Sequence, residues 1–174
     1  MHQGRTGAGS ALTDRSKARR RTAAWIWLFV TAGLTYSLDR ASKIWAEHRL
    51  AGRPPIVVIR GVLDLTYTTN SGGAFGLGER AWWIFAVATL GVSIAIVLGA
   101  RRVHRSSTAV ALGLVLGGAL GNLTDRLFHG EGLFRGTVID FIDLHVWPVF
   151  NAADTAIVVG ALLLAFVAAR SEEA

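Results

Sequence analysis

Long apolar runs alternate with polar, charge-bearing stretches along this chain. A helix needs about 20 mainly apolar residues to cross a bilayer. Four runs approach that length, at about 23–38, 81–100, 107–123 and 149–169. The first run is short, but Trp25 and Trp27 are of the residue type that anchors helices at a membrane interface. The pattern predicts an all-α membrane bundle of four transmembrane helices.

A second pattern lies between the first two runs. Residues 56–59 and 63–67 are rich in Ile, Val, Leu and Tyr, which is typical of short strands. The glycine-rich stretch at 70–78 predicts a turn or loop. We therefore expect a small β-sheet on the membrane surface beside the helical bundle.

Composition agrees with a membrane protein. The chain has 174 residues, which is enough for one domain, and 52% of them are hydrophobic. Only 17% are charged, whereas soluble domains carry roughly a quarter. The sequence contains no Cys, which excludes disulfides, thiolate nucleophiles and cysteine-ligated metal sites.

The net charge of +6 is distributed as in a membrane protein, not as in a nucleic-acid-binding protein. Basic residues cluster before the first apolar run and again at 101–105. Because basic loops stay on the cytoplasmic side, both clusters and both termini are expected to be cytoplasmic. The segments 39–80 and 124–148, with the predicted sheet, then face the extracytoplasmic side.

The N-terminal residues 1–22 form a basic tail with little apolar surface to bury, and we expect this tail to be disordered. The rest of the chain, 23–170, is expected to form one integral-membrane domain. Charged residues follow the first run where a signal peptide would have its small cleavage-site residues. This pattern favours an uncleaved first span.

Four of the twelve acidic residues lie near the predicted ends of the spans: Asp39, Asp125, Asp140 and Asp154. Asp39 has Lys43 four residues later, a spacing that allows an ion pair on a continuing helix. Asp125 lies beside Arg126, so a structural ion pair is expected there too.

Asp140 and Asp154 have apolar neighbours and no adjacent cation. Asn151, three residues before Asp154, is expected on the same helical face. Burial would raise the pKa of such carboxyl groups. If the two meet near the outer surface, they can share a proton, one serving as a base and the other as an acid. The alternative is that neighbouring groups in the bundle satisfy each acid separately.

Other chemistries find little support. The five His are scattered without an HExxH motif, there is no GxSxG motif, and Ser93 has no Lys nearby. We therefore expect no metal and no cofactor. A small transporter or ion-conducting protein that uses intramembrane Asp residues is the main alternative to an enzyme. A non-catalytic membrane scaffold is a further alternative.

Five sequence blocks, in order from 39 to 154, resemble signal peptidase II, the bacterial prolipoprotein signal peptidase. The blocks are DRASK at 39–43, TTNSGGAFGL at 68–77, GGALGNLTDR at 117–126, VIDF at 138–141 and FNAAD at 150–154. The resemblance implies a four-span aspartyl peptidase with Asp140 and Asp154 as its catalytic dyad. It further implies supporting or substrate-binding roles for Asn70, Gly121, Asn122, Asp125, Arg126, Asn151, Asp39 and Lys43.

The resemblance also implies a substrate and a location. Members of the family cut diacylglyceryl-modified prolipoproteins on the N-terminal side of the lipidated Cys, at the outer face of the plasma membrane. They use no metal, need no partner subunit and are inhibited by globomycin. Two features depart from the family pattern: the connection at 127–137 is longer than usual, and so is the basic N-terminal tail.

Overall fold

The computed structural model describes residues 6–71, 82–130 and 136–172. Four α-helices, three strands and one short 3-10 helix follow one another in this part of the chain. In chain order they are α1 (Thr6–Leu50), β1 (Ile56–Ile59), β2 (Leu63–Asn70), α2 (Trp82–Gly99), η2 (Ala100–Arg102), α3 (Ser106–Phe128), β3 (Val138–Asp143) and α4 (Ala152–Glu172).

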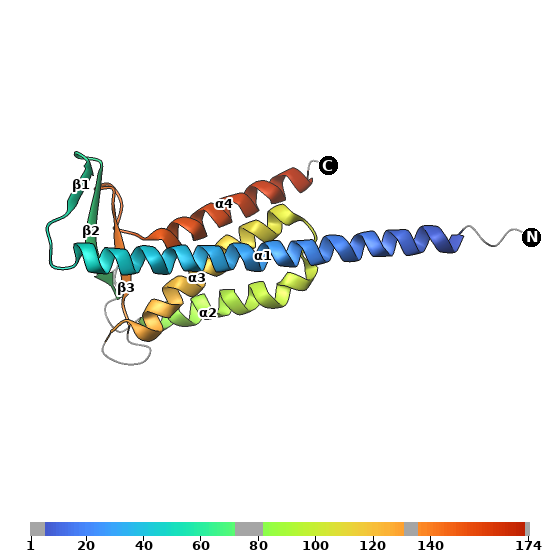
Figure 1. Ribbon diagram of the computed structural model, residues 1–174, viewed down its shortest axis with the longest axis horizontal. Helices are drawn as coiled ribbons and strands as arrows, with labels where there is room; N and C mark the ends of the chain where they lie inside the picture. The colour runs from blue at the N-terminus through green and yellow to red at the C-terminus, as the bar shows by residue number, and fades with distance from the viewer. Residues whose placement is uncertain (1–5, 72–81, 131–135, 173–174) are drawn as a thin grey trace, which may run out of the picture.

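The helices form a bundle, and the sheet covers one of its ends (Figure 1). The central helix is α3, which packs against α1, α2 and α4. The N-terminal end of α1 extends beyond the bundle, and both this end and the C-terminal end of α4 lie opposite the sheet (Figure 1). The bundle therefore has two different ends. One end carries the sheet, and the other carries the start of α1 and the end of α4 (Figure 1).

A stripe of glycines brings α3 close to α1. Gly113, Gly117 and Gly121 follow one another at intervals of four residues and share one face of α3. A side chain at Gly113 would come within 2.6 Å of the carbonyl oxygen of Leu28. A side chain at Gly121 would collide with the carboxylate of Asp39. Small residues at this spacing are what allows membrane helices to approach closely.

Apolar side chains cover much of the outside of the helices. Leu34, Leu38, Val87, Leu98 and Leu162 are each more than half exposed. The buried core between α1, α2 and α3 is built partly from small residues such as Ala24, Ala32 and Ala109. Such an apolar exterior is unusual in water but suits a lipid environment.

Two helices in the described part of the chain have the length and apolar character to cross a membrane: Ser106–Phe128 and Ala152–Arg170. They correspond to the predicted third and fourth spans. The predicted first span lies inside α1, and the second corresponds to α2.

The helix α1 is longer at both ends than the sequence pattern predicted. It begins at Thr6, so the expectation of a disordered tail differs from the structure. It also continues to Leu50, into the segment 39–80 that was expected on the extracytoplasmic side. The extension is consistent with the many Ala, Arg and Lys residues before the first apolar run, because these are good helix formers.

The sheet has the order β1-β2-β3, with both neighbouring pairs antiparallel. The first two strands confirm the strands predicted at 56–59 and 63–67, and β2 continues to Asn70. The third strand was not predicted. Because Thr68 lies opposite Asp140 in the β2–β3 register, the end of β2 is a direct neighbour of that acid.

The last turns of α1 pack against the sheet. Ala46 and Leu50 of α1 form a small buried cluster with Phe141 of β3, and Leu65 and Tyr67 of β2 pack against it. This contact fixes β3, and with it Asp140, relative to α1.

Candidate active site

Two acidic side chains from different elements share Asn151 as a hydrogen-bonding partner. Asp140 lies in the middle of β3, and Asp154 lies in the first turn of α4. The side-chain amide of Asn151 donates to Asp140 Oδ1 over 2.6 Å, and the backbone N–H of Asn151 donates to Asp154 Oδ2 over 3.3 Å. The structure therefore brings the two acids of the predicted dyad to one residue, while their catalytic role stays a prediction.

Asn151 and Asp154 also begin the helix α4. Asn151 immediately precedes Ala152, the first helical residue. Its Oδ1 accepts a hydrogen bond from the backbone N–H of Asp154 over 3.0 Å, and the Asp154 carboxylate accepts from the N–H of Asn151 in return. This reciprocal arrangement is a capping box. Asn151 is thus the cap of α4, and its contacts with Asp154 agree with the expectation that the two residues lie on one side of the helix.

Asn122 of α3 connects this pair to a second group of polar residues. Its Nδ2 donates to Asp154 Oδ1 over 2.8 Å. Its Oδ1 accepts from Lys43 Nζ over 2.7 Å and from Asn151 Nδ2 over 3.3 Å. The orientation of the amide is fixed, because its oxygen faces a cation and its nitrogen faces a carboxylate.

The second group is a buried ion cluster around Lys43. The Lys43 ammonium lies 2.8 Å from both Asp39 and Asp125, and these three side chains have no exposed surface. Arg40 forms a further ion pair with Asp125. The predicted pairing of Asp39 with Lys43 is confirmed. Buried charges of this kind require partners, because an unpaired charge in the protein interior costs several kcal/mol, on the order of 3–5.

This cluster braces the elements that carry the two acids. Asp39 Oδ1 accepts a hydrogen bond from the backbone N–H of Ala153, beside Asp154, over 3.0 Å. Asp125 Oδ2 accepts from the N–H of Ile139, beside Asp140, over 3.4 Å. Gly121 is required where it is because a side chain there would displace Asp39.

The cations that neutralise Asp125 differ from the predicted one. The sequence pointed to its neighbour Arg126, but Asp125 pairs with Arg40 and Lys43 of α1. Adjacent residues on a helix do not face each other. Arg126 instead donates from Nη1 to the carbonyl of Asn122 over 3.3 Å. Arg40 was not among the predicted site residues, although it lies inside the DRASK block.

Asp140 is only 2% exposed. Its burial, and secondarily the negative charge of Asp154, raise the pKa of Asp140 from 3.8 to about 6. Hydrogen bonds from Asn151 and Asn70 and the charge of Lys43 oppose this shift. A carboxyl group with such a pKa can hold a proton close to neutral pH, as an acid catalyst must.

A cavity of about 330 Å³ lies against Asp140. Thr68, Thr69, Asn70 and Ser71 from the end of β2 line one side, and Pro148 and Val149 complete the lining. The glycine-rich block that follows Ser71 lies outside the described residues. The cavity reaches Asp140 between the end of β2 and the segment that precedes α4.

The four acids singled out in the sequence all lie toward the sheet end of the bundle, in one connected network. A transporter would need polar groups along a path through the membrane. The inner part of the bundle is apolar instead, with a core built from residues such as Leu28, Ile96 and Leu116. The arrangement favours chemistry at one surface.

Comparisons with known proteins identify the family. The family model of signal peptidase II, peptidase family A8, matches residues 30–170. The chain belongs to the signal peptidase II family. It is therefore an aspartic peptidase, and the matched region includes every acid of the network described above.

Curated relatives agree with this assignment. The chain is 43% identical to a lipoprotein signal peptidase of Streptomyces coelicolor over 90% of this chain and 76% of the relative. It is 41% identical to the lipoprotein signal peptidase of Rhodococcus jostii over 90% of this chain and 77% of the relative.

A solved structure of a bacterial membrane enzyme has the same fold. It superposes with a TM-score of 0.70 at 27% identity, covering 79% of this chain and 89% of that chain. A second structure of a bacterial membrane enzyme gives the same TM-score at 26% identity. The bundle with its terminal sheet is thus the fold of a membrane enzyme.

Proposed function

We propose that this signal peptidase II cleaves diacylglyceryl-modified prolipoproteins on the N-terminal side of the lipidated Cys, with Asp140 and Asp154 as the catalytic dyad. The observation that carries the proposal is the shared contact with Asn151, which holds one acid from the sheet and one from α4 together. Relatives at about 40% identity are lipoprotein signal peptidases, which supports the substrate class.

The environments of the two acids support different roles for them. Asp140 has the raised pKa and keeps a proton more readily, so it donates a hydrogen bond to the scissile carbonyl oxygen. Asp154 accepts hydrogen bonds from Asn122 and from the backbone of Asn151, and it lies at the positive end of the α4 dipole. These contacts hold the Asp154 carboxylate in place, and in the proposed reaction it takes a proton from the attacking water.

The reaction then proceeds without a covalent enzyme intermediate. Water adds to the carbonyl carbon while Asp154 accepts its proton, and the proton on Asp140 stabilises the oxygen of the tetrahedral intermediate. Asp154 then gives the proton it took from the water to the leaving amine, and the C–N bond breaks as the carbonyl group forms again. The products are the free signal peptide and a lipoprotein that begins with the lipidated Cys.

The bundle suits a lipidated substrate because its exterior is apolar where the helices would face lipid. We place all four helices in the bacterial plasma membrane, with the dyad at the extracytoplasmic face. The support is the position of the basic residues: Arg21, Arg101 and Arg102 lie at the end away from the sheet, which the charge rule assigns to the cytoplasm.

The test is cleavage by the purified protein in detergent micelles. A diacylglyceryl-modified prolipoprotein and the same precursor without the lipid are incubated with the enzyme, each with and without a chelator. We expect a size shift for the lipidated substrate only, unchanged by the chelator. If the folded enzyme leaves the lipidated substrate intact, the proposed function is wrong.

A further inference from the structure

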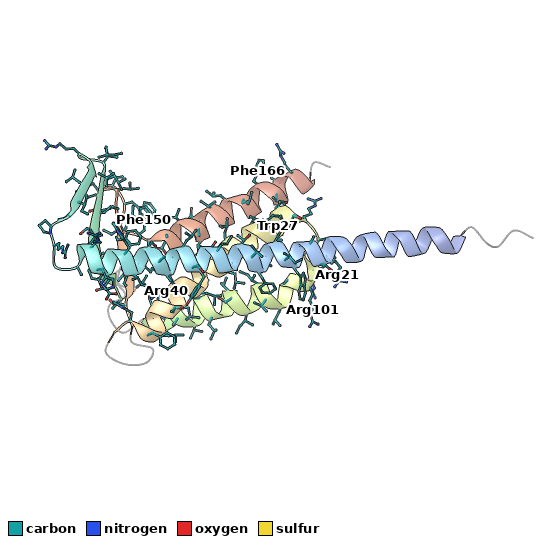
Figure 2. All side chains as sticks on the ribbon, in the orientation of Figure 1. Arg21, Trp27, Arg40, Arg101, Phe150 and Phe166 are labelled. Atoms are coloured by element: carbon teal, nitrogen blue, oxygen red, sulfur yellow. The ribbon has the colours of Figure 1, made fainter. Side chains whose placement is uncertain are left out.

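The end of the bundle opposite the active site carries a concentrated positive charge. Arg21 of α1 donates a hydrogen bond from Nη2 to the carbonyl oxygen of Arg101 over 3.4 Å, which places two guanidinium-bearing residues side by side. Arg102 follows directly in η2. Figure 2 shows Arg21 and Arg101 at this end, far from Arg40 and Phe150 near the sheet.

These cations have no acidic partner in the described part of the chain. The ion pairs found there involve Arg40, Lys43 and His145, all toward the sheet end, and none involves Arg21, Arg101 or Arg102. All three arginines are exposed. Like charges held together repel one another, so an anion between them would be attracted.

A groove leads from this basic end along α1. A cavity of about 670 Å³ is lined by Arg21 and Thr22 at one end and by Trp25, Ile26, Phe29 and Val30 beyond them. The indole N–H of Trp25 donates to the carbonyl of Ala100 over 3.1 Å, which fixes the ring beside η2. Arg21 thus lies at one end of a surface that is otherwise mostly apolar.

A second cavity lies beside the first. It has a volume of about 510 Å³ and lies between α1 and α2 over α3. Phe29 lines both cavities, so they share a wall. The lining of the second includes Tyr36 of α1, Ile94 and Leu98 of α2, and Leu116 and Leu120 of α3. Ser93, which also lines this cavity, donates its hydroxyl hydrogen to the carbonyl of Thr89.

The length of this groove matches one leaflet of a bilayer. From Trp25 to Tyr36 the helix α1 rises by about 16 Å at 1.5 Å per residue. Half of a hydrocarbon core of about 30 Å is about 15 Å. A chain that starts at the basic end would therefore reach the bilayer midplane inside the groove.

We infer that this groove binds an anionic phospholipid of the cytoplasmic leaflet. Its phosphate lies at Arg21, Arg101 and Arg102, and one acyl chain lies along Trp25 and Phe29 into the space between α1 and α2. Charge complementarity selects an anionic headgroup, and the apolar lining selects a hydrocarbon chain. The bound lipid would fill the space between α1 and α2, both of which pack against α3.

The test measures lipid retention by native mass spectrometry. The delipidated full-length protein in detergent is mixed with dioleoyl-phosphatidylglycerol or with dioleoyl-phosphatidylcholine, which have the same chains. We expect phosphatidylglycerol to be retained preferentially. Its affinity should fall about fivefold for each arginine removed in Arg21→Gln and Arg101→Gln. The control Arg53→Gln/Arg60→Gln makes the same charge change at the sheet end and should retain the lipid.

A second pair of variants tests the acyl chain. Gly33 lines the second cavity and has open space around it, so Gly33→Leu places a side chain in the groove without a clash. Gly91 of α2 also has open space but does not line the cavity, which makes Gly91→Leu its control. Only Gly33→Leu should lower phosphatidylglycerol binding.

Equal retention of the two lipids by the unsubstituted protein would overturn the inference. So would equal phosphatidylglycerol binding by the Arg21→Gln/Arg101→Gln and Arg53→Gln/Arg60→Gln proteins, or by the two leucine variants. None of these residues belongs to the proposed catalytic network, so the result does not depend on the proposed peptidase mechanism.

Discussion

Across the first turn of α4, the side chains of Asn151 and Asp154 each accept a hydrogen bond from the backbone N–H of the other residue. Asn151 Oδ1 accepts from the Asp154 backbone N–H over 3.0 Å, and Asp154 Oδ2 accepts from the Asn151 N–H over 3.3 Å. The same Asn151 side chain donates to Asp140. The start of α4 and the geometry of the proposed dyad are therefore fixed by one residue.

Two substitutions of Asn151 distinguish its role as the cap of α4 from its hydrogen bond to Asp140. Asn151→Ala removes the helix cap and the bond to Asp140, so we expect lower stability, by about 1 kcal/mol, and lower activity. Asn151→Ser keeps a capping oxygen but lacks the amide that reaches Asp140, so it should unfold near the wild-type temperature while kcat falls at least about tenfold. Thermal unfolding and initial cleavage rates measure both effects. Wild-type kcat in Asn151→Ser would show that the contact with Asp140 is unimportant.

The pKa of Asp140 predicts how stability changes with pH. Because the folded-state pKa of about 6 lies above the ordinary value of 3.8, the folded protein favours the protonated form. This contribution is fully present below pH 3.8 and is lost as the pH rises through about 6. Asp140→Asn removes the titration, so it should raise the unfolding temperature relative to wild type at pH 7.5. The underlying free-energy gain is on the order of 3 kcal/mol.

At pH 4 the advantage of Asp140→Asn should largely disappear, because wild-type Asp140 is then protonated in the folded state and already partly protonated in the unfolded state. Asp143→Asn, three residues along the same strand, removes a carboxyl group outside the proposed dyad and is the matched control. An unfolding temperature of Asp140→Asn that differs equally from wild type at both pH values would contradict the raised pKa.

Lys43 is predicted to be essential for folding, because it neutralises Asp39 and Asp125 in a buried cluster. Lys43→Met leaves two buried carboxylates with Arg40 as the remaining cation and should destabilise the protein by about 3–5 kcal/mol. Adding Asp39→Asn to Lys43→Met removes one of the unpaired charges and should recover part of the loss. The measurement is denaturant unfolding of the single and double variants. If the double variant is less stable than Lys43→Met alone, the unpaired Asp39 carboxylate is not the cause of the lost stability, which contradicts the described ion cluster.

Gly121 is predicted to tolerate no side chain. The added methyl group of Gly121→Ala would meet the Asp39 carboxylate, which accepts the hydrogen bond of Ala153 at the start of α4. We expect lower stability and slower cleavage. Gly91→Ala, in open space within α2, should instead be neutral or stabilising by up to about 1 kcal/mol. Equal unfolding temperatures for the two alanine variants would contradict the tight contact between α1 and α3.

Much of this architecture could be predicted from the sequence, because apolar runs and strand-like segments are local signals. The positions of α2, α3 and α4, the strands β1 and β2, and the Asp39–Lys43 pair follow from residue spacing. The strand β3 was missed because its first four residues, Val138 to Phe141, are all buried. A buried strand therefore lacks the alternation of polar and apolar residues that marks a surface strand.

Contacts between distant segments could not be read from the sequence. Arg40 and Asp125 are 85 residues apart, and only the packing of α1 on α3 brings them together. The same holds for Asn122, whose amide joins Lys43 to Asp154 from a third helix. The sequence suggested Arg126 as the partner of Asp125 because residue spacing reveals neighbours along the chain. It does not reveal which residues of other helices lie nearby in the bundle.

The most direct test of the central claim is a comparison of cleavage rates on a diacylglyceryl-modified prolipoprotein. Wild type, Asp140→Asn, Asp154→Asn and the control Asp143→Asn are purified and shown to be folded by thermal unfolding. Loss of either member of an acid–base pair should reduce the rate by at least about a thousandfold, while Asp143→Asn stays within a few-fold of wild type. If folded Asp140→Asn or Asp154→Asn cleaves as fast as Asp143→Asn, the two acids are not the catalytic dyad.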